Sequence, residues 1–280
     1  GMRDLDQVWL AITGAQWLSG ECGGFQFIDD QIVHIRQYRN NNLPGALRLI
    51  DRDQIECREI ALLLQLVGPM QAWGVTSRFD ERDSGLEPSK SGVIGLLCAA
   101  LGRDRAEPVD DLAALRMGVR VDREGLLMRD YQTATGLLLA SGKPDHKRTA
   151  ISPRFYLADA AFLVGLEGSR TLLDTLQSAL KQPVWPLSLG RKSMPPGKPV
   201  WLADGVRDTD LLTTLEQADY LTEPLQPHDT QPLRLMLEHP TEGAVRLDQP
   251  VAPFAQRRFG PRFVQSATLE RRHAPDPTHA

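Results

Sequence analysis

From residue 61 onward, short apolar runs alternate with capped helical patterns, and their order restricts the fold more than any other feature. The apolar runs are typical of buried strands, and the helical patterns are bounded by Ser, Pro and Gly. In chain order, they predict a strand at 61–68, helices at 89–102 and 108–116, strands at 117–122, 126–136 and 159–168, a helix at 169–183 and a strand from 200. This order favours an α+β fold: a ferredoxin-like (RRM-like) antiparallel sheet with helices on one face.

The C-terminal third adds fewer signals. A helix is expected at 208–217 and a strand at 233–238. The segment 254–265, FAQRRFGPRFVQ, is basic and aromatic. Its bases Arg257, Arg258 and Arg262 suit either RNA or a neighbouring protein, and the sequence leaves both open.

The first part of the chain has a different pattern. Residues 25–38, FQFIDDQIVHIRQY, alternate apolar and polar side chains around an Asp-Asp turn, which predicts a hairpin. Residues 40–45, NNNLPG, have the composition of a loop. Residues 1–58 are therefore interpreted as an N-terminal extension of unknown role.

Composition excludes several protein classes. Hydrophobic residues make up 41% and charged residues 24% of the 280, as in a globular protein. No apolar run approaches the about 18 residues of a membrane span, and no signal peptide is recognisable. The cysteines Cys22, Cys57 and Cys98 form no CxxC pair, so neither a disulfide framework nor a zinc site is expected. A cytoplasmic location is the default expectation.

The formal net charge of −4 argues weakly against a nucleic-acid binder, but the bases are clustered. Between residues 125 and 158, two acids, Asp130 and Asp145, stand among the bases Arg129, Lys143, Lys147, Arg148 and Arg154. Phosphate binding depends on such local clusters rather than on net charge. The segment is therefore a candidate RNA contact.

Two further sites lie near the first strand. Gln71 and Trp73 follow it in a long loop, where a ring and an amide can meet an unstacked base; alternatively, Trp73 closes the edge of the domain. Ser89, Lys90 and Ser91 begin a helix, where free N–H groups, a hydroxyl and an ammonium can bind phosphate. The alternative there is an ordinary N-cap with a solvated lysine.

Arg129 and Tyr131 alternate with Asp130 on a predicted strand, so both side chains face the same side of the sheet. A base and an aromatic on one sheet face are typical of an RNA-binding platform. The alternative is a cross-strand salt bridge beside a core tyrosine.

Five motifs in register go beyond these patterns. They are GPMQAWG at 68–74, PSKSGVIGLLCAALG at 88–102, LMRDYQT at 127–133, SPRFYLADAAFLV at 152–164 and SLGRKS at 188–193. With these motifs, residues 62–207 resemble the Cas-five family of RAMP proteins, in the branch found in type I-E CRISPR systems. The first 58 residues have no counterpart in that pattern.

The resemblance implies a ferredoxin-like RNA-binding domain with an inserted basic thumb. It also implies a subunit of the antiviral Cascade complex that binds the 5′ handle of the CRISPR guide RNA and caps the backbone filament, without being an enzyme. The implied partners are the guide RNA, the Cascade backbone subunit and the Cascade large subunit; a homo-oligomer is not expected. In the thumb, the implied RNA contacts are Lys147, Arg148, Arg154 and Tyr156, and in the SLGRKS loop they are Arg191 and Lys192.

The resemblance also suggests domain boundaries. Residues 59–265 are expected to form the RNA-binding domain, with the thumb at about 136–158, and residues 266–280 a loose tail. No cofactor or metal is expected, because the histidines are scattered and no GxxxxGK[ST] motif occurs.

An enzyme remains the alternative. Metal-independent cleavage of precursor guide RNA needs a base, an acid and a cation near the phosphate. His146, Lys147 and Tyr131 are the residues that could fill these roles.

Overall fold

We analysed a computed structural model of the chain, which describes residues 59–75, 81–139, 141–222 and 231–271, and the backbone of four earlier strands. The residues form two compact units, Gly1–Arg58 and Glu59–Ala280. In the first unit, β1 (Trp17–Gly20), β2 (Gly23–Ile28), β3 (Gln31–His34) and β4 (Leu49–Ile50) form a sheet in that order. The hairpin predicted in this region is present as β2 and β3, which pair antiparallel.

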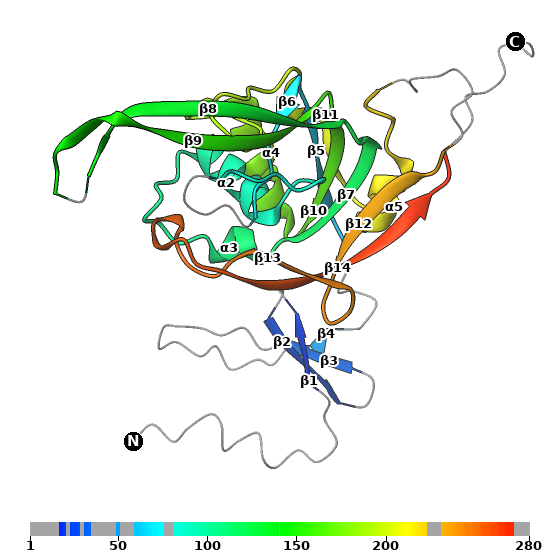
Figure 1. The fold of residues 1–280 in the computed structure, drawn as a ribbon. Helices are drawn as coiled ribbons and strands as arrows, with labels where there is room; N and C mark the ends of the chain where they lie inside the picture. The colour runs from blue at the N-terminus through cyan, green and yellow to red at the C-terminus, as the bar shows by residue number, and fades with distance from the viewer. Residues whose placement is uncertain are drawn as a thin grey trace, which may run out of the picture. The chain divides into compact units, whose positions relative to one another are not determined.

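The second unit is built on a seven-stranded sheet whose neighbouring strands are all antiparallel (Figure 1). Its spatial order is β11-β5-β10-β7-β12-β14-β13. The strands are β5 (Ala61–Val67), β7 (Arg116–Arg123), β10 (Ala161–Glu167), β11 (Trp201–Arg207), β12 (Leu233–His239), β13 (Ala244–Pro250) and β14 (Phe259–Leu269).

Strand β5 is apolar except for Gln65, because both faces of the sheet are covered at its position. Leu62 and Leu64 belong to the large core cluster, which also contains residues of α2 (Lys90–Leu101) and α4 (Arg170–Lys181). Leu63 belongs to a second cluster with residues of α5 (Leu211–Gln217). The prediction of helices on one face therefore holds for α2 and α4 but not for α5.

The predicted helix boundaries follow from local capping. Ser89 caps α2 by accepting a hydrogen bond from Gly92 N (3.3 Å), and Gly102 ends it with a φ of 71°. Asp210 caps α5 by accepting from Thr213 N (2.9 Å). The short helix predicted at 108–116 is the single turn α3 (Asp110–Ala113).

A second sheet of three strands, in the order β6-β9-β8, differs most from the prediction. Strands β8 (Leu126–Leu138) and β9 (Pro144–Ala158) form a long hairpin, and β6 (Met70–Gln71) pairs with the base of β9. The hairpin begins about ten residues before the boundary of 136 that was expected for the thumb. The segment after residue 136 contains β-branched residues such as Thr149 and Ile151, which suit a two-sided exposed strand.

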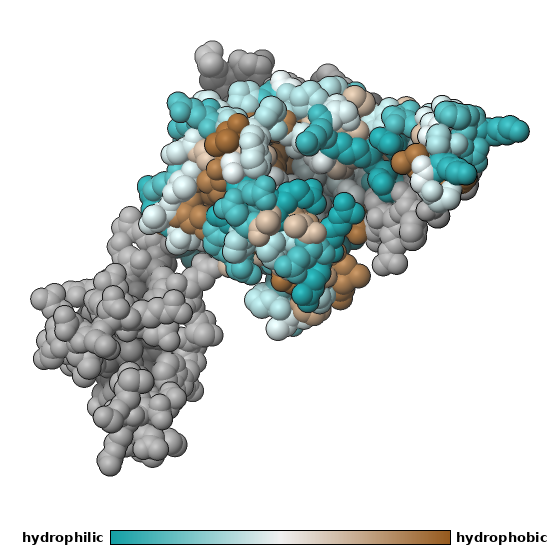
Figure 2. Space-filling view, turned by 90° about the vertical axis from the view of Figure 1, so that its left-hand side faces the viewer, coloured by the Kyte–Doolittle hydropathy of each residue, from teal (hydrophilic) through white to brown (hydrophobic). Residues whose placement is uncertain are grey.

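The C-terminal region is also more ordered than predicted. Strand β13 was not anticipated, and β14 continues to Leu269, so residues 266–269 of the predicted tail belong to the sheet. A 3-10 turn, η2 (Phe254–Gln256), precedes β14. On the face that Figure 2 shows, apolar side chains gather in small groups among hydrophilic ones. None of the helices described is long and apolar enough to cross a membrane.

Candidate nucleic-acid interface

The β8–β9 hairpin extends from the body of the second unit, with β6 at its base (Figure 1). Most of its side chains are exposed, and Tyr131 is 62% exposed. Because the hairpin carries bases along both strands, it is the main candidate surface for a polyanion.

Three arginines from three separate segments converge at the base of the hairpin. Arg154 lies on β9, and Arg82 pairs beside it as a short parallel bridge. Arg82 N donates to Pro153 O (3.0 Å), and Phe155 N donates to Arg82 O (2.8 Å). Arg191 reaches the same place from the SLGRKS loop: its Nη2 donates to Arg82 O (3.1 Å).

The charges of this group, which we name the arginine cluster (Arg82, Arg154 and Arg191), repel one another. Burial, followed by the positive charges of Arg154 and Arg82, lowers the pKa of Arg191 below its ordinary value, while Asp83 and Asp130 partly oppose this. The Nε of Arg154 is buried without a hydrogen-bond partner. A cluster of guanidinium groups in which one buried nitrogen, Arg154 Nε, lacks a partner is well suited to bind a phosphate.

Gly190 places Arg191 in the cluster. Its φ of 90° is accessible mainly to glycine, and a Cβ there would lie 1.7 Å from the carbonyl oxygen of Ala72. At Gly190 the loop packs closely against the protein's own backbone, where Ala72 N donates to Leu189 O (3.1 Å). Lys192, the next residue but one, is exposed.

The predicted hairpin contacts divide between the two faces of the hairpin. Arg154 pairs with Asp130, and Tyr156 with Met128, so these four side chains share one face. Arg129 and Tyr131 lie on the other face, where they are exposed. An RNA strand that contacts both sets must therefore pass around the hairpin rather than across one face.

The residues considered for cleavage are not brought together. His146 and Lys147 lie near the hairpin tip, and a Cβ at Gly136 would be 3.7 Å from His146 Nδ1. Tyr131, which pairs with Pro153, lies five residues before Gly136 on β8. At the rise of a strand, five residues correspond to about 16 Å between Tyr131 and Gly136. The side chain of Arg148 lies outside the part of the chain described. Within that part, no group of three potential metal ligands is found.

Gln71 and Trp73 occupy buried positions. Gln71 Nε2 donates to Leu66 O and Ala160 O (both 2.9 Å), and Trp73 Nε1 donates to Gln71 Oε1 (3.2 Å). Trp73 is only 1% exposed and packs so closely on α2 that a Cβ at Gly92 would lie 2.8 Å from its ring. The arrangement corresponds to the alternative in which Trp73 closes the domain, because neither side chain reaches the surface.

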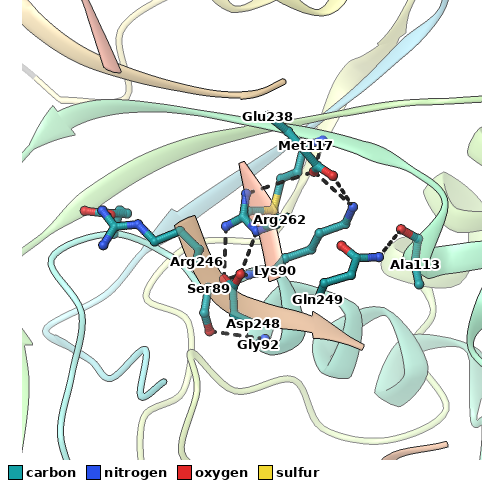
Figure 3. Close-up of polar contacts among 11 residues, drawn as sticks. Ser89, Lys90, Gly92, Ala113, Met117, Glu238, Arg246, Asp248, Gln249 and Arg262 are labelled. Carbon is teal, nitrogen blue, oxygen red and sulfur yellow. Dashed lines mark hydrogen bonds and ion pairs between the residues drawn. The ribbon is translucent and has the colours of Figure 1, made fainter. Parts of the chain in front are cut away.

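The start of α2 is tied to the C-terminal strands rather than open to solvent (Figure 3). Lys90 is 2% exposed, and its Nζ donates to both carboxylate oxygens of Glu238 (2.8 and 2.9 Å). Its backbone N donates to Asp248 Oδ2 (2.8 Å), and Asp248 in turn pairs with Arg262 (2.6 Å). We name Lys90, Glu238, Asp248 and Arg262 the buried ionic network.

This network differs from both interpretations of the helix start, since Lys90 is neither solvated nor open to a phosphate. Burial lowers the pKa of Lys90, and the charge of Glu238 opposes that shift. With its N–H and ammonium already paired, Lys90 offers nothing to a phosphate in this arrangement, and Ser89 is occupied as the N-cap. Ser91 lies within the first turn of α2 and is half-buried. Arg262 belongs to the network and is not exposed.

Sequence reasoning did not select Arg82. The one sequence feature that could have indicated Arg82 is the length of the loop between the first strand and the first helix. Loops of that length in a compact domain are usually functional. Its pairing with β9, distant in sequence, could not be anticipated from local pattern.

Comparisons with known proteins agree with this architecture. The chain is 34% identical over 156 residues to the CRISPR system Cascade subunit CasD of Escherichia coli (strain K12), covering 50% of this chain and 69% of that protein. A solved structure described as "Crystal structure of Cas protein" matches with a TM-score of 0.62 and 50% identity, over 75% of this chain and 95% of that one. A chain of a CRISPR RNA-guided surveillance complex matches with a TM-score of 0.64 and 34% identity, over 75% and 90%.

The match to a protein family covers both sheets of the second unit. It extends over residues 61–265, from the first residue of β5 into β14, and includes the hairpin and the arginine cluster. The chain therefore belongs to the family described as CRISPR-associated protein (Cas_Cas5).

Proposed function

We propose that this chain is a non-catalytic subunit of a Cascade surveillance complex, in which it binds the 5′ handle of a CRISPR guide RNA and caps the backbone filament in antiviral defence. The relatives named as a Cascade subunit and as part of an RNA-guided surveillance complex support the assembly. The backbone subunit and the large subunit of that complex are the proposed protein partners.

The arginine cluster is the observation that most supports RNA binding. Guanidinium groups from the loop before α2, from β9 and from the SLGRKS loop meet at one place, although their charges repel. A bound phosphate would relieve this repulsion, and Arg is suited to bidentate phosphate contacts. Arg129, Tyr131, Tyr156, Lys147, Arg148 and Lys192 are proposed to extend the RNA path along the hairpin and the neighbouring loop.

We assign the first part of the sheet to the ferredoxin-like class. The strand order β11-β5-β10-β7, with α2 after β5 and α4 after β10, supports this assignment. In this assignment, the β8–β9 hairpin is the thumb, inserted between β7 and β10, and it carries most of the proposed RNA contacts.

A role without catalysis is favoured by the hairpin geometry. A separation of about 16 Å along β8 between Tyr131 and the neighbourhood of His146 is too large for both to act on one phosphate.

The test is a mobility-shift and cleavage assay of the purified chain with labelled repeat RNA in EDTA. We expect binding that weakens with salt, no new fragments, and a loss of affinity of about tenfold in Arg154→Ala, because a charge-assisted phosphate contact contributes about 1.5–3 kcal/mol. Lys143→Ala is the control, since Lys143 is an exposed base near the hairpin tip.

Equal small effects of the two substitutions would contradict the role of the arginine cluster. A single discrete cut that disappears in His146→Ala would instead establish a processing nuclease.

A further inference from the structure

One edge of the seven-stranded sheet carries exposed apolar side chains and pairs with no further strand among the described residues. Strand β13 is that edge, and its residues 244–247 are all exposed. The one charged residue in this exposed stretch, Arg246, is ion-paired with Glu87 (2.7 Å). Val245 is 57% and Leu247 61% exposed, and Val251 and Phe259 continue the apolar surface beyond the end of the strand. Proteins usually protect such edges with charges, proline or a covering segment, because a free edge can pair with another chain.

The opposite edge of the same sheet shows this protection. On β11, Arg207 Nη2 donates to Asp204 Oδ2 (2.5 Å), so an ion pair lies along the strand. Gln177 of α4 donates to Leu202 O (2.6 Å), and Lys181 Nζ lies 5.4 Å from the ring centre of Trp201. On β13, the ion pair of Arg246 with Glu87 leaves Val245 and Leu247 exposed on either side of it.

The exposed half of β13 is held in an extended form by the half that follows it. Asp248 belongs to the buried ionic network, and Gln249 Nε2 donates to Ala113 O (2.7 Å). The strand is thus fixed to the body at 248–250 while 244–247 remain open. A preformed extended edge can accept another strand with little loss of conformational entropy.

Unpaired bases lie beside the end of this edge. Arg258 O accepts a hydrogen bond from Val251 N (3.3 Å), and Arg257 has a φ of 52°, a conformation that is costly for a residue other than glycine. In the described part of the chain, neither arginine has an ion-pair partner. The edge therefore combines aliphatic side chains, free strand hydrogen-bonding groups and positive charge.

We propose that residues 244–247 of β13 accept an extended segment of another protein subunit of the same complex, which adds to the sheet as an outer strand. The segment is expected to place apolar side chains against Val245 and Leu247 and carboxylates against Arg257 and Arg258. This inference rests on the proposed function for the identity of the complex, and it names a contact surface on this chain.

The chemistry favours protein over RNA as the occupant. Val245 and Leu247 have no planar surface on which a base can stack, and strand addition uses peptide groups that RNA lacks. The proposed RNA path, on the hairpin and the arginine cluster, uses a different sheet of the second unit.

The test compares the double variant Val245→Lys/Leu247→Lys with the control Val184→Lys/Leu212→Lys, whose residues are also exposed but lie outside the sheet. Each full-length variant is co-expressed with the other subunits of its complex and the guide RNA, and retention of each subunit on the tagged chain is measured. Hydrogen exchange at residues 244–247 is compared between the free chain and the complex.

We expect the edge variant to retain at least tenfold less of one protein subunit than the unmodified chain does. The control variant should retain that subunit in the normal amount. Both variants should bind free repeat RNA like the unmodified chain. We also expect exchange at 244–247 to slow at least tenfold in the complex.

Unchanged subunit retention and exchange would overturn the inference even if RNA binding is normal. Loss of RNA binding in the edge variant alone would make the edge an RNA contact, and loss of a dimer of the free chain would make the occupant a second copy. Failure of RNA binding in the unmodified chain would instead contradict the proposed function.

Discussion

Gly190 determines where Arg191 can lie. With a φ of 90°, and with only 1.7 Å between the position of a Cβ and Ala72 O, alanine cannot occupy this position unless the loop moves. We expect Gly190→Ala to lower the free energy of unfolding by about 1–3 kcal/mol and to reduce RNA affinity as much as Arg191→Ala does. Urea unfolding and mobility shift measure the two effects.

The matched control for this substitution is Gly142→Ala. Gly142 also has a positive φ, of 78°, but no atom lies within 4 Å of a Cβ there. If both substitutions change stability and RNA affinity equally, the close contact with Ala72 does not position Arg191.

Lys90 was recognised from the sequence as a charged residue at the start of a helix, but its burial and its ion pair with Glu238 were not. Lys90→Ala should destabilise the second unit by about 3 kcal/mol, because it leaves the Glu238 carboxylate without its main partner in a mostly buried site. Urea unfolding followed by circular dichroism tests this. The double variant Lys90→Met/Glu238→Gln should recover most of the loss, since it removes both charges; a loss that persists would show that packing, not charge, is responsible.

At the scale of single residues, local pattern predicted caps well and burial poorly. Ser89 and Gly102 bound α2 as expected, because capping depends on neighbours in sequence. The ion pair of Lys90 with Glu238 joins residues far apart in the chain, as does the contact of Arg82 with β9. Such contacts depend on the assembled sheet, and a single sequence carries no direct signal for them.

At the scale of elements, β9 is the least predictable part of the fold, whereas β8 was predicted at 126–136. Strand β9 mixes charged, polar and β-branched side chains and is mostly not buried, so the period of two that identifies a half-buried strand is missing. The apolar strands β5 and β10, by contrast, were predicted within about two residues, because burial on both faces gives a continuous signal.

Shortening the hairpin should separate RNA affinity from stability. Replacing residues 134–150 by Asn-Gly would join Thr133 to its partner Ile151 through a two-residue turn while keeping Arg154 and Tyr131. The body should retain its unfolding midpoint, because the removed part makes few contacts with the core. RNA binding should weaken, and its salt dependence should decrease by about 1.5 in slope as the proposed phosphate contacts Lys147 and Arg148 are lost. An unchanged slope would place the RNA away from the hairpin tip.

At the scale of the whole molecule, the seven-stranded sheet explains why one unit can present two separate surfaces. The inserted hairpin leaves the sheet between β7 and β10, whereas β13 ends the sheet on the side of β12 and β14. The buried ionic network links α2 to β12, β13 and β14 and contains no residue of the hairpin. RNA binding and subunit docking can therefore be disrupted one at a time.

The division at residue 58 leads to the last prediction. The second unit contains both edges of its sheet, and the family match begins at residue 61, so its fold uses no strand of the first unit. A chain that starts at Glu59 after an initiator methionine should unfold within about 2 °C of the full chain, because the core residues described for the second unit all belong to that unit. Its affinity for repeat RNA should agree within about twofold, a difference of about 0.4 kcal/mol. Calorimetry and mobility shift provide the comparison. A large loss of RNA affinity at unchanged stability would assign residues 1–58 a direct part in binding, whereas a loss of stability would show that the two units fold together.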